Sequence, residues 1–202
     1  MDDAAAPLPA PALDGRRARR ESNRERVVDA LLELFRQGHV VPSLDLVAER
    51  SGVSHRSVFR YFDDLEELHR VAIERSYTRH AHLFDLPGIG EGSLAARIER
   101  LVDHRLALHD ETANLARVAR MKAPTHPVLA QNIAANRSLL REQLVAHFGP
   151  ELERAGSAVL VTASTLTAME AIDVMMTDND RGAVRAGLVE SLGRLLTEKE
   201  AR

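Results

Sequence analysis

The sequence predicts an all-α protein, and three observations lead to this expectation. Apolar residues recur along most of the chain at the i, i+3, i+4 spacing of helices, and no alternating strand pattern interrupts them. Glycine and proline breaks separate these periodic segments, for example at Gly38, Gly52 and Pro124. With 202 residues, 45% of them hydrophobic, the chain is long enough to bury a core in one large domain or two small ones.

Residues 1–22 are predicted to form a disordered N-terminal arm that ends in a basic segment. Residues 1–15 are rich in proline and alanine, which favours disorder. Between residues 16 and 26, six arginines stand against two glutamates, although the whole chain has a net charge of −3. A basic end on an acidic body suits a protein that touches DNA at one place, whereas many arginine-rich tails only keep a chain in solution.

A helix is expected at residues 23–37, with Val28, Leu31, Leu32 and Phe35 on one stripe and Gly38 at its end. Two short helices joined by a glycine turn follow. Ser43 is a good N-cap for the first of them, and Ser54 for the second. Gly52 stands where the chain must turn, and a positive φ costs glycine nothing.

The second of these short helices places Val58 and Phe62 inward and leaves polar side chains pointing elsewhere. In a helix-turn-helix, the second helix enters the DNA major groove and presents its N-terminal side chains to base edges. Two amphipathic helices with a glycine turn also occur in ordinary helical bundles, but the nearby arginines favour DNA binding. The side chains expected to contact bases or phosphates are Arg16, Arg17, Arg19, Arg20, Ser43, Ser54, His55, Arg56, Ser57, Arg60 and Tyr61.

Several segments between residues 23 and 73 match a known family in order and spacing. They are Asn23 to Phe35 with Gly38, Val47-Ala48, Ser51-Gly52-Val53-Ser54, Val58-Phe59, Tyr61-Phe62 and Glu66-Glu67-Leu68. Together they resemble the tetracycline-repressor-like (TetR) family of one-component regulators. Two positions depart from that family's pattern. Phe59 stands where the family usually has a tyrosine whose hydroxyl meets a phosphate, and Leu65 where it usually has a lysine.

The resemblance implies a particular organisation and function. It implies a three-helix DNA-binding domain at residues 23–70, followed at 71–202 by a helical domain for ligand binding and dimerisation. The expected partners are a double-stranded DNA operator, a second copy of the chain and a small-molecule effector. We therefore expect a sequence-specific transcriptional regulator, a homodimeric repressor that a small molecule releases. Control by a protein partner, or an all-helical enzyme, are the alternatives.

The C-terminal part reads as a series of helices. A long helix is expected at 64–82, where Asp64 and Glu67 form a capping-box-like start, and the glycine-rich residues 86–93 are expected to link two domains. Further helices are predicted at 94–110, 111–122, 126–148, 156–176 and 181–197.

The last two of these helices are expected to form the dimer interface. Their small residues would let two backbones approach closely in a four-helix bundle with the symmetry mates; the alternative is that the same helices only close the core of one subunit. These small residues are Ala158, Thr162, Ala163, Thr165, Gly187 and Gly193.

Polar side chains on otherwise apolar helices suggest a ligand cavity. Arg105, Glu170 and Asp173 interrupt apolar stripes, and a buried charge must be paired or must meet a ligand. An internal pair between Arg105 and a carboxylate, or charges at the rim of a dimer, would explain them equally well. The residues expected to line the cavity are Arg105, Asn114, Met121, Asn132, Asn136, Glu170 and Asp173.

Other classes of function lack support in the sequence. The chain has no cysteine, its nine histidines show no metal-binding spacing, and no nucleotide-binding or hydrolase motif occurs. Its start does not read as a signal peptide, and the uncharged residues 155–169 are too few to span a membrane. We therefore expect a soluble cytoplasmic protein without catalytic activity, cofactor or metal.

Overall fold

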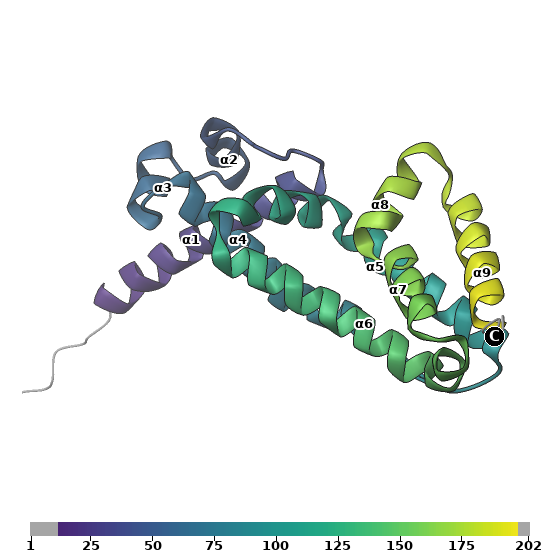
Figure 1. Cartoon of the computed structure of the whole chain (residues 1–202). Helices are drawn as coiled ribbons and strands as arrows, with labels where there is room; N and C mark the ends of the chain where they lie inside the picture. The colour runs from purple at the N-terminus through teal and green to yellow at the C-terminus, as the bar shows by residue number, and fades with distance from the viewer. Residues whose placement is uncertain (1–11, 198–202) are drawn as a thin grey trace, which may run out of the picture. The chain divides into compact units, whose positions relative to one another are not determined.

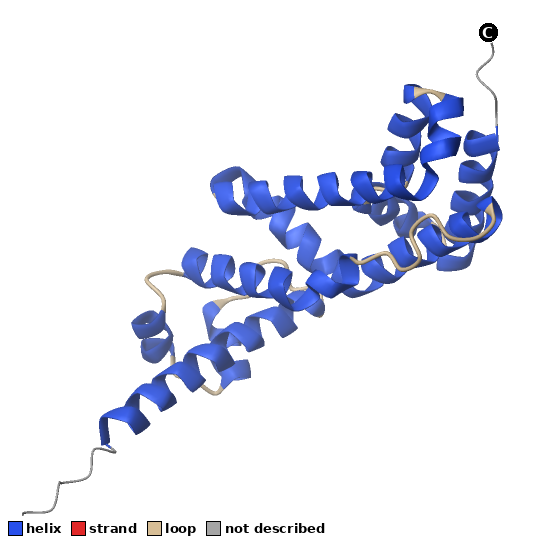
Figure 2. Cartoon of the chain, turned by 90° about the horizontal axis from the view of Figure 1, so that it is seen from below, coloured by secondary structure: helices blue, strands red, loops and turns tan. Residues whose placement is uncertain are grey.

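A computed structural model describes residues 12–197, with side chains from residue 15 onward. Contacts within the chain divide it into two compact units, Met1–Ile73 and Glu74–Arg202. Throughout the described range the regular elements are all helices and no strand is present (Figure 2). The prediction of an all-α fold is therefore confirmed.

The first unit is a small helical domain around one apolar core. It contains α1 (Ala12–Arg36), α2 (Leu44–Ser51), α3 (His55–Tyr61) and the first half of α4 (Leu65–His80) (Figure 1). Helix α1 packs along α2 and also contacts α3. The inward-facing residues predicted from the sequence, including Val28, Leu31, Phe35, Val58 and Phe62, are buried, and Val47 and Leu68 are buried with them.

The start of α1 corrects the sequence prediction. The arm at 1–22 was expected to be disordered, but the helix already begins at Ala12. Residues 1–11 of that arm lie outside the described range. Alanine, arginine and glutamate are strong helix formers, and Glu21 lies 3.8 Å from Arg24 one turn further on, so this part of the arm continues the helix that follows it.

The second unit is a bundle of longer helices. It begins with the second half of α4. This is followed by η1 (Ala81–Phe84), α5 (Leu94–Lys122), η2 (Ala123–Thr125), α6 (Pro127–Ala155), α7 (Ser157–Leu166), α8 (Met169–Asp178) and α9 (Arg181–Thr197) (Figure 1). Helix α5 packs against α6, α8 and α9. Its core joins side chains from all of these helices, including Ile98, Leu101, Leu144, Phe148, Ile172, Leu188 and Leu192.

Two predicted helix ends in this unit were wrong. Residues 94–110 and 111–122 form the single helix α5, because no proline or glycine interrupts them and Thr112 only adds a bond to the carbonyl of Leu108 (2.6 Å). The helix predicted at 126–148 continues to Ala155. Gly149 and Pro150 do not end it, but the backbone leaves helical geometry at Phe148, so the expected stop is a kink.

The helix predicted at 156–176 is broken into α7 and α8, which differ in direction by 53°. At the break, the hydroxyl of Thr167 donates to the carbonyl of Ala163 (2.8 Å), and Ala168 has an extended backbone. Within the described chain, no single helix is long and apolar enough to cross a membrane. Only α7 and α8 taken together reach that length and composition.

The glycine-rich residues 86–93 were expected to link two domains, and this was also wrong. They lie inside the second unit, whose boundary falls earlier, before Glu74. Arg100 donates to the carbonyl oxygens of Gly88 (2.7 Å) and Glu91 (2.9 Å). The ring Nδ1 of buried His147 accepts a bond from the backbone N–H of Gly90 (3.0 Å). These bonds fasten the segment to α5 and α6.

Candidate DNA-binding surface and effector pocket

The geometry of α2, the turn and α3 is set by local contacts. The hydroxyl oxygen of Ser43 accepts a bond from the N–H of Leu46 (3.3 Å) and so caps α2. Gly52 ends α2 with a φ of +65°, as the glycine turn required. The guanidinium of Arg26, on α1, donates to the carbonyl of Ser51 (2.5 Å). Arg26 therefore ties the turn to the first helix, a role that the sequence did not suggest.

Helix α3 buries one face and exposes the other. Val58 and Tyr61 face the core, whereas His55, Arg56, Phe59 and Arg60 are exposed. Ser54 precedes the helix as predicted, but its hydroxyl bonds to that of Ser57 (3.1 Å) rather than to a backbone N–H. Ser54 is also exposed, and Ser57 is half-buried.

Two neighbouring contacts, both made by His55, organise the exposed face. The Nε2 of His55 lies 2.9 Å from the carboxylate of Asp45, on α2, and its ring meets the ring of Phe59 edge to face with centroids 5.9 Å apart. Arg56 makes no hydrogen bond or ion pair with any described residue. Its guanidinium is therefore available to another molecule.

Tyr61 does not project from α3 as the sequence suggested. Its side chain is buried, and its hydroxyl lies 3.4 Å from the amide nitrogen of Asn23 and 3.2 Å from the guanidinium of Arg60. These two hydrogen bonds, first that of Asn23 and then that of Arg60, lower the pKa of the Tyr61 phenol. Because i+3 from Val58 lies on the same side of a helix, the ring joins the core that Val58 begins.

The basic segment runs along the first turns of α1. Arg16, Arg17, Arg19 and Arg20 are all exposed. Arg20 also reaches the carbonyl of Arg60, at the end of α3 (3.5 Å). The structure thus brings one end of the basic segment close to the exposed face of α3, within the same unit.

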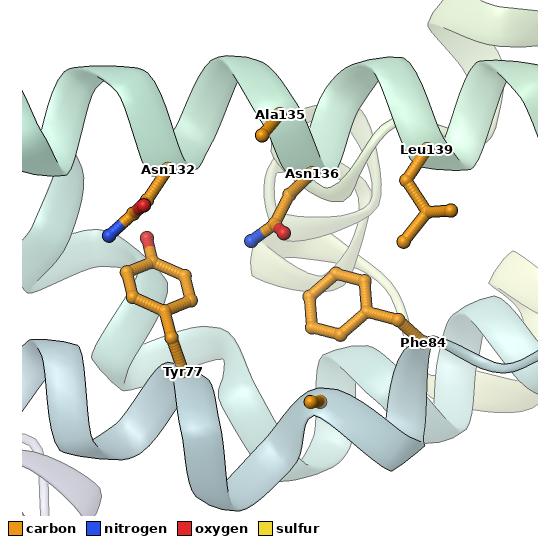
Figure 3. A pocket seen from close by; sticks show the side chains of 7 residues that line it. Tyr77, Phe84, Asn132, Ala135, Asn136 and Leu139 are labelled. Carbon is orange, nitrogen blue, oxygen red and sulfur yellow. The ribbon is translucent and has the colours of Figure 1, made fainter.

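The second unit contains a pocket of about 160 Å³ between two helical stripes (Figure 3). One stripe holds Tyr77, Ala81 and Phe84, at i, i+4 and i+7 on α4 and η1. The other, on α6, holds Asn132, Ala135, Asn136 and Leu139. In Figure 3 the Tyr77 hydroxyl points toward Asn132, whereas Phe84 and Leu139 lie together at the other end.

The pocket is polar at one end and uncharged throughout. Burial raises the pKa of the Tyr77 phenol, so this side chain stays neutral at physiological pH. The side chains of Tyr77, Asn132 and Asn136 form no hydrogen bond with any described residue. None of the side chains that line the pocket is charged.

Two of the seven residues predicted to bind a ligand, Asn132 and Asn136, line this pocket, and the others lie elsewhere. Arg105 is fully buried and donates to the side chain of Gln143 (2.9 Å) and the carbonyl of Leu140 (3.1 Å). Burial lowers the pKa of its guanidinium to about 10. The alternative of a pair between Arg105 and a carboxylate is not what the structure shows, since these acceptors on α6 are neutral.

The two carboxylates on α8 are ion-paired with other helices. Asp173 accepts from Arg117 (2.5 Å) and Arg120 (2.9 Å) on α5 and lies 3.1 Å from Nε2 of His109. Glu170 accepts from Arg137 on α6 (2.6 Å).

Burial by itself raises the pKa of both carboxyl groups. Hydrogen bonds from Arg117 and His109 to Asp173, and from Arg137 to Glu170, outweigh it and lower both pKa values. The ionised carboxylates therefore hold α8 against its neighbours.

The remaining two predicted residues do not reach the pocket. Asn114 accepts from Arg117 (2.5 Å), and Met121 is exposed. Tyr77 and Phe84 were not among the predicted ligand-binding residues, although their i, i+7 spacing was a usable signal for one helical stripe. In the part of the chain that is described, no group of three histidine, aspartate or glutamate side chains is placed to hold a metal ion.

The small residues proposed for a dimer interface are only partly exposed. Ala158, Thr162, Thr165 and Gly187 face outward, but Ala163 is fully buried in the core of the unit and Gly193 is half-buried. Two large apolar side chains also face outward, Val161 on α7 and Val174 on α8.

Comparison with known proteins supports the fold. No family model matches the chain, and no curated protein matches it in sequence. Among solved structures, it is similar to a candidate transcriptional regulator of Streptomyces coelicolor A3(2), with a TM-score of 0.61 and 23% identity over 87% of this chain and 99% of that one. A TetR-family transcriptional regulator of Streptomyces coelicolor matches with a TM-score of 0.63 and 20% identity, over 87% and 80% of the two chains.

The chain therefore has the fold of TetR-family transcriptional regulators, with an N-terminal helix-turn-helix and a C-terminal helical domain.

Proposed function

We propose that this protein is a sequence-specific DNA-binding regulator, a homodimer that represses transcription until a small molecule binds its second unit. One observation carries the first part of the proposal. Helix α3 exposes His55, Arg56 and Arg60 on a single face, in the helix-turn-helix geometry that places such a face in a major groove. The exposed arginines of α1 supply further charge for the DNA backbone.

The test is selection of bound fragments from genomic DNA, followed by titration of the selected site with variants. Arg56→Ala should flatten the sequence preference at one position in each half-site, because one arginine–guanine contact contributes about 1–3 kcal/mol of discrimination. Replacing Arg16, Arg17 and Arg19 by alanine should weaken binding to all DNA sequences to a similar extent and reduce the salt dependence of the affinity. Arg141→Ala, at an exposed arginine on α6 outside the proposed dimer faces, is the matched control and should change neither. Failure to select any fragment would refute the proposal.

A homodimer is proposed through the outward faces of α7, α8 and α9. Val161 is 62% exposed and Val174 is 70% exposed, and α7 also exposes the small residues Ala158, Thr162 and Thr165. A twofold dimer would hold two α3 helices for two half-sites about 34 Å apart. Val161→Arg and Val174→Arg should yield monomers in light scattering, whereas Val128→Arg on α6, also exposed, should remain dimeric. A wild-type monomer at micromolar concentration would exclude this part of the proposal.

The pocket is the proposed effector site, and its lining favours an uncharged ligand with a ring and a hydrogen-bonding group. Tyr77, Asn132 and Asn136 offer donors and acceptors that the described protein leaves unused. Phe84 and Leu139 offer an apolar surface, and a cavity of about 150 Å³ is known to hold benzene. A charged ligand would lose its hydration without gaining an opposite charge, since Arg120, whose field reaches Tyr77, is already paired with Asp173.

Three molecules of similar shape test this assignment: benzamide, benzoate and benzamidinium. At millimolar concentration benzamide should raise the melting temperature most, and Asn136→Leu should abolish the effect. Met121→Ala, outside the pocket, should leave it intact. Equal effects of all three molecules, or none, would contradict the ligand class.

The coupling between pocket and DNA is proposed to run through α4. This helix begins in the first unit and carries Tyr77 in the second. An effector that prefers one conformation of α4 lowers DNA affinity by its differential affinity for the two states, typically 5- to 150-fold, and DNA lowers effector affinity equally. Reciprocal titrations measure this. A pocket ligand that leaves DNA affinity unchanged would point instead to control by a protein partner.

A further inference from the structure

The exposed face of α3 carries one side chain that cannot form hydrogen bonds to DNA. Phe59 is 55% exposed, and among the large hydrophobic residues that the described chain exposes it is the only aromatic one. The others are aliphatic residues scattered over different elements, which is ordinary for a protein surface. Phe59 is different because it lies in the middle of a cationic face.

The position follows from helix geometry. Residues turn by about 100° each along a helix, so His55 and Phe59 lie one turn apart on the same side, with Arg56 and Arg60 beside them. The edge-to-face contact with His55, which Asp45 holds from α2, fixes the ring in this place. A surface built in this way presents an ordered apolar group beside two arginines.

The major groove offers little for such a group to contact. Its floor consists of hydrogen-bond donors and acceptors, and the one apolar group that it displays is the C5-methyl of thymine, or of 5-methylcytosine. We propose, on the basis of the DNA-binding function above, that Phe59 recognises the C5-methyl group of a thymine next to the bases that Arg56 and His55 contact. Phe59 is then a specificity-determining residue, and each half-site contains one thymine that uracil cannot replace.

The experiment uses the full-length protein and the operator obtained by selection. Each thymine is replaced singly by deoxyuridine, which removes the methyl group and keeps every hydrogen-bonding atom. Affinity should fall about fourfold at one thymine in each half-site, the effect of exposing one methyl-sized group, and about fifteenfold when both are replaced. At all other thymines the replacement should have little effect. Replacing each cytosine by 5-methylcytosine separates the two sources of the methyl group and should not raise affinity.

Variants at Phe59 then assign the effect to this side chain. Phe59→Ala should bind the thymine and uracil operators equally, whereas Phe59→Leu should keep part of the preference for thymine. Both should fold, because the ring is exposed, and melting temperatures check this. Wild-type protein that binds DNA but does not distinguish thymine from uracil overturns the inference, as does a Phe59→Ala variant that still distinguishes them. Absence of any DNA binding refutes the proposed function itself.

Discussion

Removing either Arg97 or Glu151 alone should destabilise the second unit far more than removing both. Arg97 on α5 donates to both carboxylate oxygens of Glu151 on α6 (2.5 and 3.1 Å) and to the carbonyl of His147 (2.6 Å). Both side chains are buried. Breaking one side of such a pair leaves a buried charge without its partner, whereas replacing both sides leaves none.

The magnitude for Arg97→Met can be estimated from the groups that lose their partner. The Glu151 carboxyl has an ordinary pKa of 4.5, which the hydrogen bond from Arg97 lowers further in the folded protein. Without Arg97 it can accept a proton at pH 7 at a cost of about 3.4 kcal/mol, from 2.5 pKa units at about 1.36 kcal/mol each. The lost bond to His147 adds about 1 kcal/mol. We expect a total loss of about 4 kcal/mol.

Urea unfolding at pH 7 and a single protein concentration measures this double-mutant cycle of Arg97 and Glu151. Glu151→Met should lower the free energy of unfolding by about 3–5 kcal/mol, whereas that of the double variant should lie within about 2 kcal/mol of the wild-type value. Arg141→Met, at an exposed arginine on α6, is the control and should cost at most about 0.5 kcal/mol. Additive losses in the Arg97→Met/Glu151→Met double variant would refute the reasoning. In wild type, the contribution of the pair should be present above about pH 4.5 and lost as the pH falls through the lowered folded-state pKa of Glu151.

Three further outcomes follow from the structure. Gly52→Ala should destabilise the first unit by about 1–2 kcal/mol, because the φ of Gly52 is +65° and a Cβ there would lie 2.6 Å from a nitrogen of Arg26. Gly15→Ala should instead stabilise this unit by about 0.5–1 kcal/mol, because Gly15 lies in α1 with open space around it, and thermal melts measure both effects. Burial lowers the pKa of His147, so its contribution to stability is present above about pH 6.5 and decreases as the pH falls below that value. The protection factor of the Gly90 amide, its exchange rate relative to that of an unstructured peptide at the same pH, should then fall in acid, and a protection factor independent of pH would contradict this. Asp173→Asn should lower the free energy of unfolding in urea by about 2 kcal/mol, because it removes charge-assisted hydrogen bonds from α5, and it should leave benzamide binding unchanged. Loss of benzamide binding without loss of stability would show that Asp173 belongs to the ligand site.

The helix-turn-helix was predictable because local rules determine it. A serine at an N-cap, a glycine with positive φ and apolar residues one turn apart each act within a few residues, and Ser43, Gly52 and Val58 occupy the expected positions. Tyr61 was assigned to the wrong face although its i+3 spacing from Val58 marked it as buried. Its polar hydroxyl suggested a surface role, but one hydroxyl can be satisfied from within, here by Asn23 and Arg60.

The helix boundaries of the second unit were less predictable, because competing local signals nearly cancel there. Proline at position 150 ended the helix in the sequence prediction, whereas a kink at Phe148 accommodates it without ending α6. Nothing as strong as proline marks the break at Thr167, where a side-chain bond to Ala163 and the extended Ala168 redirect the chain. Such small preferences become decisive only when tertiary packing favours one of the outcomes.

Charge on an apolar stripe proved a poor guide to the pocket, and Arg105 shows why. Burial lowers its pKa to about 10, so keeping the charged guanidinium buried carries a desolvation cost. That cost is offset because one planar group reaches two acceptors on α6, Gln143 and the carbonyl of Leu140.

A buried charge thus needs partners within the folded chain, and in this unit the buried charges bind neighbouring helices. Their hydrogen-bonding groups are then no longer available to a ligand. Neutral polar groups are under weaker pressure, because leaving one partly exposed costs little. The hydrogen-bonding groups that remain available to a ligand are therefore the uncharged ones, on Tyr77, Asn132 and Asn136.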